Sequence, residues 1–242
     1  MLTLLTTAID QIRTHAYAFP DEEVCGLIVD GAAIRCVNKA EQKFNHFTID
    51  AREYLHCDDR GTIQALYHSH CNDNDEFSVT DIQACKAHQL PWILCTKEGQ
   101  IKLYDPTVVA PYLGREWRWS CQNCYTLFQD WYKQELNIYL SDFYLSAPDV
   151  DRNTSVGFLE NFEPQGFRRL GLYEPLQQHD VMLMVFGSRI PNHVGVLVDA
   201  TKNLMLHHVS GRLSEHAPYG DDWRKRTHSV WRYTGFAGQV RG

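Results

Sequence analysis

The stretch at residues 66–81, LYHSHCNDNDEFSVTD, restricts the possible structures of this chain more than any other part of it. His68 and His70 are one residue apart, and because side chains alternate along a β-strand, both imidazoles are expected on the same side. Seven residues separate His70 from Ser78, and two separate Ser78 from Asp81. Two histidines and one carboxylate around an open fourth position are typical of a catalytic zinc site. The alternative, surface polar residues at a strand end, is disfavoured by so specific a spacing.

Helices and strands are predicted to alternate around this stretch. Short apolar runs bounded by turn residues predict strands, and Asp30-Gly31 is a turn pair that predicts a hairpin. Apolar residues at helical spacing predict an amphipathic first helix; they are Leu2, Leu5, Ile9 and Ile12. The predicted strands cover 24–29, 33–37, 63–70, 91–96 and 100–104, and further helices cover 51–57 and 80–89. This order predicts a mixed α/β (α+β) module.

A second module is expected after a break at residues 105–119. This tract contains two prolines and a glycine and interrupts the periodicity, which is typical of a domain boundary. We therefore predict domains over 1–107 and 108–242. Residues 1–105 carry 9 Lys+Arg against 16 Asp+Glu, whereas the remainder carries 14 against 14. The net charge of −7 argues against nucleic acid as the main ligand, and the acidic first half suits a cation.

Cys124 is the candidate nucleophile of the second module. Asn123 is expected to cap a helix, which places Cys124 in its first turn. The positive end of the helix dipole lowers the pKa of a thiol there, so Cys124 is expected to alkylate faster than Cys25 or Cys85. Two alternatives are an inert buried cysteine and half of a four-cysteine zinc site with Cys121; the lack of a second Cys-x-x-Cys disfavours the latter. Cys121 is also the weaker nucleophile candidate, because it precedes the helix.

Two histidines near the far end of the module could serve this thiol. Strands are predicted over 180–186, 191–199 and 204–208. His193 leads one strand and His207 lies in its neighbour, so the two could pair across a sheet. A cysteine at a helix start, a histidine base and a polar group that orients the base make the general arrangement of thiol hydrolases. His208 is the alternative to His207, and strand alternation puts the two on opposite faces, so only one can serve.

With Glu23 included, the first module carries Glu-x-Cys-Gly followed by the His-Ser-His, Ser and Asp pattern. This resembles the motif of the JAB/MPN metallopeptidases (JAMM), over roughly the first 105 residues. The resemblance implies a domain with a mixed sheet and flanking helices, and a zinc site formed by His68, His70 and Asp81. It further implies that Glu23 accepts a proton from water and that Ser78 hydrogen-bonds the polarised carbonyl oxygen.

Two other residues bear on this assignment. Glu22 competes with Glu23 as the base, but Glu23 matches the Glu-x-Cys-Gly spacing better. Cys71 stands where many family members have proline after the second histidine. Its thiol could reach the metal, or the residue could be merely an adaptable small one. This substitution bears on turnover more than on metal binding.

The second module resembles the NlpC/P60 cysteine peptidases over residues 111–242. Asn-Cys-Tyr-x-Leu-x-x-Asp-Trp-Tyr surrounds the nucleophile, and His-Val-Gly-Val and Met-Leu-His surround the two histidines. The resemblance implies a papain-like domain with helices packed on an antiparallel sheet. It implies that Cys124 attacks an amide carbonyl, that His193 takes and returns the proton, and that His207 holds the His193 ring.

The order of the two modules resembles the tail-tip assembly proteins of long-tailed phages, of the lambda type, over nearly the whole chain. That resemblance implies two amide-hydrolysing centres, phage tail-tip proteins as partners, and peptidoglycan peptide crosslinks or a phage tail protein as substrate. One alternative is a structural or chaperone-like assembly component whose peptidase folds have weak or no activity. Another is a cellular isopeptidase for ubiquitin-like tags, which the second module disfavours.

The expected location follows from what the sequence lacks. The N-terminus has no positive region and is interrupted by Asp10, so it makes a poor signal peptide. No run reaches the ~20 apolar residues that cross a bilayer, so no membrane insertion is expected. The eight cysteines are expected to be free thiols. We expect the protein in the host cytoplasm during assembly, with the virion tail tip and the host periplasm as later sites.

Overall fold

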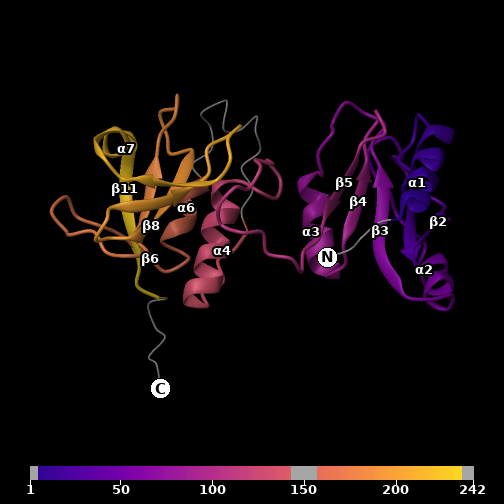
Figure 1. The fold of residues 1–242 in the computed structure, drawn as a ribbon, viewed down its shortest axis with the longest axis horizontal. Helices are drawn as coiled ribbons and strands as arrows, with labels where there is room; N and C mark the ends of the chain where they lie inside the picture. The colour runs from indigo at the N-terminus through magenta and orange to yellow at the C-terminus, as the bar shows by residue number, and fades with distance from the viewer. Residues whose placement is uncertain (1–4, 143–156, 236–242) are drawn as a thin grey trace, which may run out of the picture. The chain divides into compact units, whose positions relative to one another are not determined.

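Residues 1–109 and 110–242 form two compact units, and each contains its own sheet (Figure 1). The structure, a computed structural model, describes residues 5–142 and 157–235. The helices of the first unit are α1 (Thr6–Ala18), α2 (Ala51–Asp58) and α3 (Val79–His88). Its strands are β1 (Cys25–Val29), β2 (Ala32–Cys36), β3 (Ile63–Ser69), β4 (Trp92–Cys95) and β5 (Ile101–Tyr104). They form a sheet in the order β2-β1-β3-β4-β5.

The parallel pairing of β3 with β4 explains where the polar residues of the 66–81 stretch lie. The other neighbouring strands of this sheet are antiparallel, and a parallel pair needs a crossover connection. Helix α3 lies within that connection, so its first turn follows the carboxyl end of β3. As a result, Asp81 in the first turn of α3 lies near His68 in β3 and His70 just beyond it.

The first helix and the hairpin follow the sequence pattern closely. Helix α1 packs on the sheet through a core in which Ala8, Ile12, Ile28 and Tyr67 are buried. It begins at Thr6, later than predicted, and Leu2 of the predicted helix lies outside the described residues. The turn between β1 and β2 is Asp30-Gly31, and both residues have positive φ, as a tight hairpin turn requires.

Gly26, of the Glu-x-Cys-Gly pattern, lies where β1 is flanked closely by both neighbouring strands. A Cβ atom there would clash with the Ile34 carbonyl oxygen and the Tyr67 ring, and both are held in the sheet. We expect Gly26→Ala to lower the free energy of unfolding by about 1–3 kcal/mol, the usual cost of overpacking a core. Urea unfolding followed by circular dichroism would measure this change.

Gly220→Ala is the matched control for that substitution. A Cβ atom at Gly220 would meet nothing within 4 Å, and its φ of −93° suits any residue. Its unfolding free energy should stay within about 0.5 kcal/mol of the wild-type value. Equal unfolding midpoints for the Gly26→Ala variant and the wild-type chain would contradict the close packing of β1.

The second unit is built on an antiparallel sheet. Its helices include α4 (Cys124–Leu136), α6 (Gly157–Phe162) and α7 (Asp221–Arg226). Its strands are β6 (Phe167–Arg169), β7 (Val181–Met184), β8 (His193–Asp199), β9 (Leu204–His207), β10 (Glu215–Pro218) and β11 (Thr227–Tyr233). The described strands are arranged as β10-β9-β8-β7-β11-β6, and every neighbouring pair is antiparallel.

Helix α4 packs on this sheet through one apolar face. Its buried residues recur at helical spacing; they are Cys124, Tyr125, Leu127, Phe128, Trp131 and Tyr132. They belong to one core cluster that also includes Val194 and Val196 of β8 and Trp231 of β11. Asn123 caps the helix by accepting hydrogen bonds from the backbone N–H groups of Tyr125 and Thr126, as the sequence predicts. The cap and the apolar face together fix Cys124 at the start of a helix that packs against β8.

Arg115 anchors the segment that leads into α4. Its buried guanidinium donates to Asp130 (2.6 Å) and to the Pro111 carbonyl oxygen (2.7 Å). Its backbone N–H donates to the Ser214 hydroxyl (2.8 Å), and the Ser214 N–H donates back to the Arg115 carbonyl oxygen (3.0 Å). The segment before α4 is therefore tied to the segment that enters β10.

The mixed sheet with flanking helices and the antiparallel sheet with helices packed on it confirm the predicted α+β class. All eight cysteines are free thiols, as expected. Within residues 5–142 and 157–235, no helix has the length and apolar character needed to span a bilayer.

Candidate functional site

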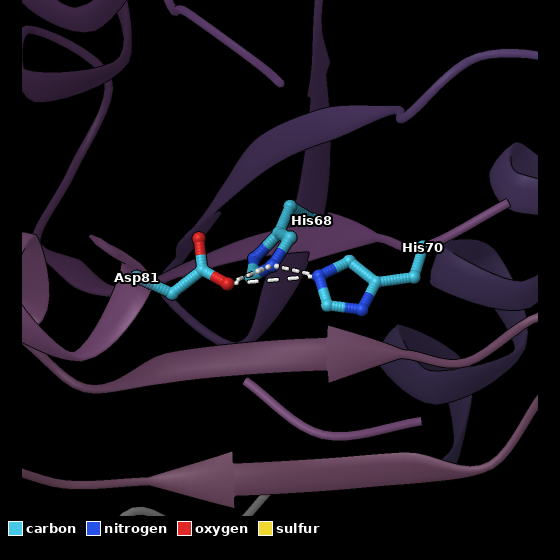
Figure 2. A group of neighbouring side chains, drawn as sticks. All are labelled: His68, His70 and Asp81. Atoms are coloured by element: carbon cyan, nitrogen blue, oxygen red, sulfur yellow. Dashed lines mark hydrogen bonds and ion pairs between the residues drawn. The ribbon is translucent and has the colours of Figure 1, made fainter. Parts of the chain in front are cut away.

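The side chains of His68, His70 and Asp81 converge at the end of β3 (Figure 2). The Nε2 atoms of His68 and His70 are 3.3 Å apart. Asp81 Oδ2 lies 3.5 Å from His68 Nε2 and 3.6 Å from His70 Nε2. His68 and His70 are buried, and Asp81 is half-buried. Three ligand atoms of the type that zinc prefers therefore point at one spot.

The spacing of these three atoms fits a tetrahedral zinc ion. Bonds of about 2.0–2.1 Å at tetrahedral angles put neighbouring ligand atoms about 3.3–3.4 Å apart. The three observed separations, 3.3, 3.5 and 3.6 Å, are close to that value. Three protein ligands leave the fourth position open, as in catalytic zinc sites. The residues present thus fit the metal in ligand type and in geometry.

The electrostatics also suit a cation at this point. Burial lowers the pKa of His68, which favours the neutral imidazole that metal binding needs. Burial also acts to lower the pKa of His70. Interactions with Asp81, the Asn74 carbonyl and Glu23 have the larger combined effect, so the pKa of His70 is raised. Burial alone would raise the pKa of Asp81, but hydrogen bonds with both imidazoles hold it far below its usual range. An ionised Asp81 carboxylate thus faces a neutral His68 imidazole, which are the protonation states that metal binding needs.

Neighbouring groups orient two of the three side chains. His70 Nδ1 donates to the Asn74 carbonyl oxygen (2.8 Å), which leaves Nε2 to face the site. Asp81 Oδ2 accepts from the Ser78 N–H (2.8 Å), and Ser78 Oγ accepts from the Asp81 N–H (3.0 Å). This reciprocal capping box holds Asp81 at the start of α3. Ser78 is thus the N-cap of α3.

Glu23 lies beside the three ligands. Its Oε1 is 3.9 Å from His70 Nε2, and the side chain is buried. Burial raises the pKa of Glu23 to about 7, with a further rise from Asp81 and an opposing effect of His70. A carboxylate with a pKa near neutrality suits a general base.

The middle residue of His-Ser-His fixes the backbone of Val24, the residue after Glu23, which no sequence pattern had indicated. Ser69 Oγ accepts from the Val24 N–H, and the Ser69 N–H donates to the Val24 carbonyl oxygen, both at 3.0 Å. Strand alternation points Ser69 away from the imidazoles on either side of it, and this alternation is the signal that could have revealed the contact.

Cys71 lies to one side of the three ligands. Its Sγ donates to the Phe44 carbonyl oxygen (2.9 Å), and it lines a small cavity of about 130 Å³ with Tyr17 and Lys97. His70 lines both this cavity and a cleft of about 730 Å³, which Glu23, Ser78 and Asp81 also line. Cys71 therefore lines a cavity other than this cleft.

The cleft at the three ligands also has aromatic walls. Phe47 stacks on His68 with ring centroids 4.7 Å apart, and Trp92 contacts the edge of the same imidazole at 5.7 Å. Both line the cleft with Leu90 and His88. No local sequence pattern links Phe47 to His68, because Phe47 comes from a loop 21 residues before it.

The second unit contains a histidine pair. His193 Nε2 lies 3.3 Å from His207 Nδ1, and both side chains are buried. His207 Nε2 is 3.8 Å from Glu215 Oε1. His208 instead hydrogen-bonds the Arg212 carbonyl oxygen (3.0 Å) and packs against Trp117. The structure therefore brings His207, and not His208, to His193.

Cys124 and His193 line one cavity of about 130 Å³. Burial raises the pKa of Cys124 to about 11, although hydrogen bonds with the backbone of Val194 in β8 and of Tyr125 and Cys124 at the helix start act in the opposite direction. Burial also lowers the pKa of His193 well below its ordinary value, and His207 adds to this effect. The expectation of a thiolate at rest is therefore wrong, because desolvation outweighs the helix dipole. A neutral thiol and a neutral imidazole face the same space.

The alkylation rate of Cys124 should accordingly rise about tenfold per pH unit from pH 6 to 9, since the thiolate fraction grows until pH approaches the pKa. Peptide mapping after timed iodoacetamide treatment would measure it. Cys25, whose pKa burial raises to about 12, is the internal control and should react more slowly. A rate that levels off below pH 8 would instead indicate a resting thiolate–imidazolium pair.

One family model and two curated proteins match this chain, and together the matches cover both of its units. A family model described as prokaryotic homologs of the JAB domain matches residues 6–119. The chain is 30% identical over 233 residues to the tail tip assembly protein K of Escherichia phage N15, with 93% of each chain covered. It is 34% identical over 182 residues to the tail tip assembly protein K of Escherichia phage lambda, covering 75% of this chain and 87% of that one. The JAB match includes Glu23, Ser78 and the three candidate ligands.

Proposed function

Because this chain belongs to the family of the phage tail tip assembly protein K, with a JAB-like domain in its first half, we propose that it assists tail-tip assembly and hydrolyses amide bonds. The first centre is a zinc-dependent JAMM-type peptidase over 1–107. The second is an NlpC/P60-type cysteine endopeptidase over 108–242. The candidate substrates are peptidoglycan peptide crosslinks and a phage tail protein, and the partners are other tail-tip proteins. The expected locations are the host cytoplasm during assembly and the virion tail tip.

In the first centre, His68, His70 and Asp81 would hold zinc, which supplies a Lewis acid that polarises a carbonyl and activates water. Glu23 accepts a proton at its carboxylate, which its pKa of about 7 permits at neutral pH. It then delivers that proton to the leaving amine. The Ser78 hydroxyl donates to the oxygen of the scissile carbonyl while it continues to accept the Asp81 N–H.

In the second centre, Cys124 Sγ attacks the amide carbonyl while its proton passes to His193. The C–N bond then breaks, the amine takes the proton from His193, and water hydrolyses the thioester with His193 as base. His207 holds the His193 ring through Nε2, which leaves Nδ1 of His193 for the thiol. The proton transfer accompanies attack, because the thiol is neutral at rest.

The observation that carries the proposal is the convergence of three ligand atoms within 3.3–3.6 Å of one another, with a buried carboxylate beside them. Two buried imidazoles and two carboxylates around one point are not expected without a functional cause, since each buried polar group costs free energy unless it is paired. A metal ion offsets that cost.

The test is to incubate the full chain separately with purified peptidoglycan and with tail-tip proteins, and to identify new amine ends by mass spectrometry. We expect the wild-type chain to produce such ends. Cys124→Ala should remove the products of the second centre only, and Asp81→Asn those of the first centre only. Intact substrates with the folded wild-type chain would instead support an assembly component without activity.

A further inference from the structure

One ring nitrogen of His207 has no hydrogen-bond partner among the described residues. Its Nδ1 faces His193 Nε2, whereas its own Nε2 is buried and unpaired. A buried polar atom without a partner costs free energy, so a polar group nearby has a direct effect on it. Trp223 packs edge-on against this imidazole, with ring centroids 4.4 Å apart, but an indole N–H only donates and cannot accept a proton from Nε2.

Glu215 is the carboxylate beside that nitrogen. It lies directly opposite His207 in the antiparallel pair of β9 and β10, so the two side chains are on the same face of the sheet. Its Oε1 is 3.8 Å from His207 Nε2, and among the described residues it is the one carboxylate within 4.0 Å of either imidazole. The strand is fixed just before this residue, because the backbone of Ser214 is tied to Arg115. The Glu215 side chain is 53% exposed, so rotation of its carboxylate can bring the oxygen to hydrogen-bond distance.

The two imidazoles can share their protons in two ways. Both are neutral at pH 7, because burial lowers the pKa of His207 to about 4 and that of His193 well below its ordinary value. In a neutral imidazole one nitrogen donates and the other accepts. Across the 3.3 Å contact, either His193 Nε2–H donates to His207 Nδ1 or His207 Nδ1–H donates to His193 Nε2.

A carboxylate at His207 Nε2 favours the first arrangement over the second. In the first, His207 Nε2 carries a proton that Glu215 accepts, and Nδ1 of His193 has a free lone pair. In the second, a bare Nε2 faces the carboxylate, so two acceptors oppose each other. His193 Nδ1 then carries a proton and cannot act as a base. The nitrogen that carries the proton on each ring is thus set by the partner of the other nitrogen.

We propose that Glu215 is a positioning residue of the thiol centre, which selects the arrangement in which His193 Nδ1 can take the proton of the Cys124 thiol. Glu215 acts through the two imidazoles and not on the substrate. The thiol proton stays on His193 until the leaving amine takes it. The inference rests on the proposed function, because it concerns the second centre, but the arrangement of protons is present without substrate.

Glu215→Lys tests this role, because it replaces an acceptor with a group that only donates. Long-range ¹H–¹⁵N correlation NMR of the full chain, labelled with ¹⁵N-histidine, reads which ring nitrogens carry protons. The peaks of the pair are assigned by their loss in His193→Gln and His207→Gln. We expect protons on Nε2 of both imidazoles in the wild-type chain. In Glu215→Lys the ammonium donates to a bare His207 Nε2, so both imidazoles should carry their proton on Nδ1.

The rate of thiol-dependent amide cleavage should follow the arrangement of protons. Glu215→Lys should lower kcat by about tenfold, the usual effect of one hydrogen bond to a charged group, with KM within about twofold of the wild-type value. Glu215→Gln, whose amide can accept or donate, should show a mixture of both arrangements and an intermediate kcat. Glu160→Lys is the matched control, because it makes the same change of charge at an exposed position of α6 and should change neither the protons nor kcat.

Three results would overturn the inference. They are a wild-type chain with the proton of His207 on Nδ1, a Glu215→Lys variant with the wild-type arrangement, and an unchanged kcat in that variant. Glu215 is exposed on the edge strand β10, so the thermal unfolding midpoint of Glu215→Lys should match the wild-type midpoint. If this variant failed to fold, Glu215→Gln would carry the test, and a single wild-type arrangement in it would overturn the inference. A wild-type chain with the expected protons but without cleavage would contradict the proposed function alone.

Discussion

Asp81→Asn is expected to purify with less than about one tenth of the zinc per chain that the wild-type protein holds. The substitution removes one of three ligands and the negative charge that stabilises a cation between the imidazoles. An amide oxygen can still accept the Ser78 N–H, so the cap of α3 is kept and loss of metal is separated from loss of fold. Elemental analysis of protein purified without chelator measures the change.

Asp73→Asn is the matched control for the zinc measurement. Asp73 lies in the loop between His70 and Ser78, but its carboxylate is exposed and pairs with Lys97 (2.8 Å). Asp73→Asn removes one negative charge, as Asp81→Asn does, but this charge is not on one of the three ligands. The zinc content of Asp73→Asn should therefore stay at the wild-type level. If Asp81→Asn kept its full zinc content as well, the site built on His68, His70 and Asp81 would be wrong.

The first candidate site could be placed from the sequence because its geometry depends on local rules. A period of two puts His68 and His70 on one side of β3. A parallel strand pair requires a crossover, and Ser78 and Asp81 have the spacing of a capping box at the start of its helix. The alternation of His68 and His70 acts within a few residues and was predicted, whereas the parallel pairing of β3 with β4 joins residues such as Leu66 and Trp92 and was not.

What the sequence could not predict depends on residues far apart in the chain. Phe47 reaches His68 from a loop between β2 and α2, and only the folded chain brings them together. The resting state of Cys124 was mispredicted for the same reason. The helix start is visible in the sequence, whereas the burial that raises the pKa of the thiol comes from the core shared with β8 and β11.

The short strands at the sheet edges were also missed. β6 has three residues and β10 has four, so neither offers enough positions to show a period of two. β11 is longer, and its buried Ser229 and Trp231 do alternate with more exposed neighbours. Because Ser229 is polar, β11 does not show an apolar period of two in the sequence. The histidine pair was still predicted, because His193 and His207 lie in strands with strong apolar runs.

His193→Gln is expected to lower the rate of thiol-dependent amide cleavage by about 10²–10⁴-fold, the usual contribution of a general base. The neutral thiol of Cys124 needs a base at the moment of attack, and His193 lines the same cavity. His216→Gln is the control, because His216 is exposed on β10, and it should leave the rate unchanged. Rates are measured as amine ends released per minute by the wild-type and variant chains.

The pH dependence of the amide cleavage rate of the wild-type chain tests the buried His193–His207 pair. Burial and His207 hold the pKa of His193 well below its ordinary value, so the neutral form that acts as base persists as the pH falls through 6.5. Protonation would remove the base only as the pH falls through that lowered pKa, and the cleavage rate should therefore change little between pH 8 and pH 6. A loss of rate with a midpoint near 6.5, the ordinary pKa of histidine, would show an imidazole exposed to water and would contradict the buried His193–His207 pair.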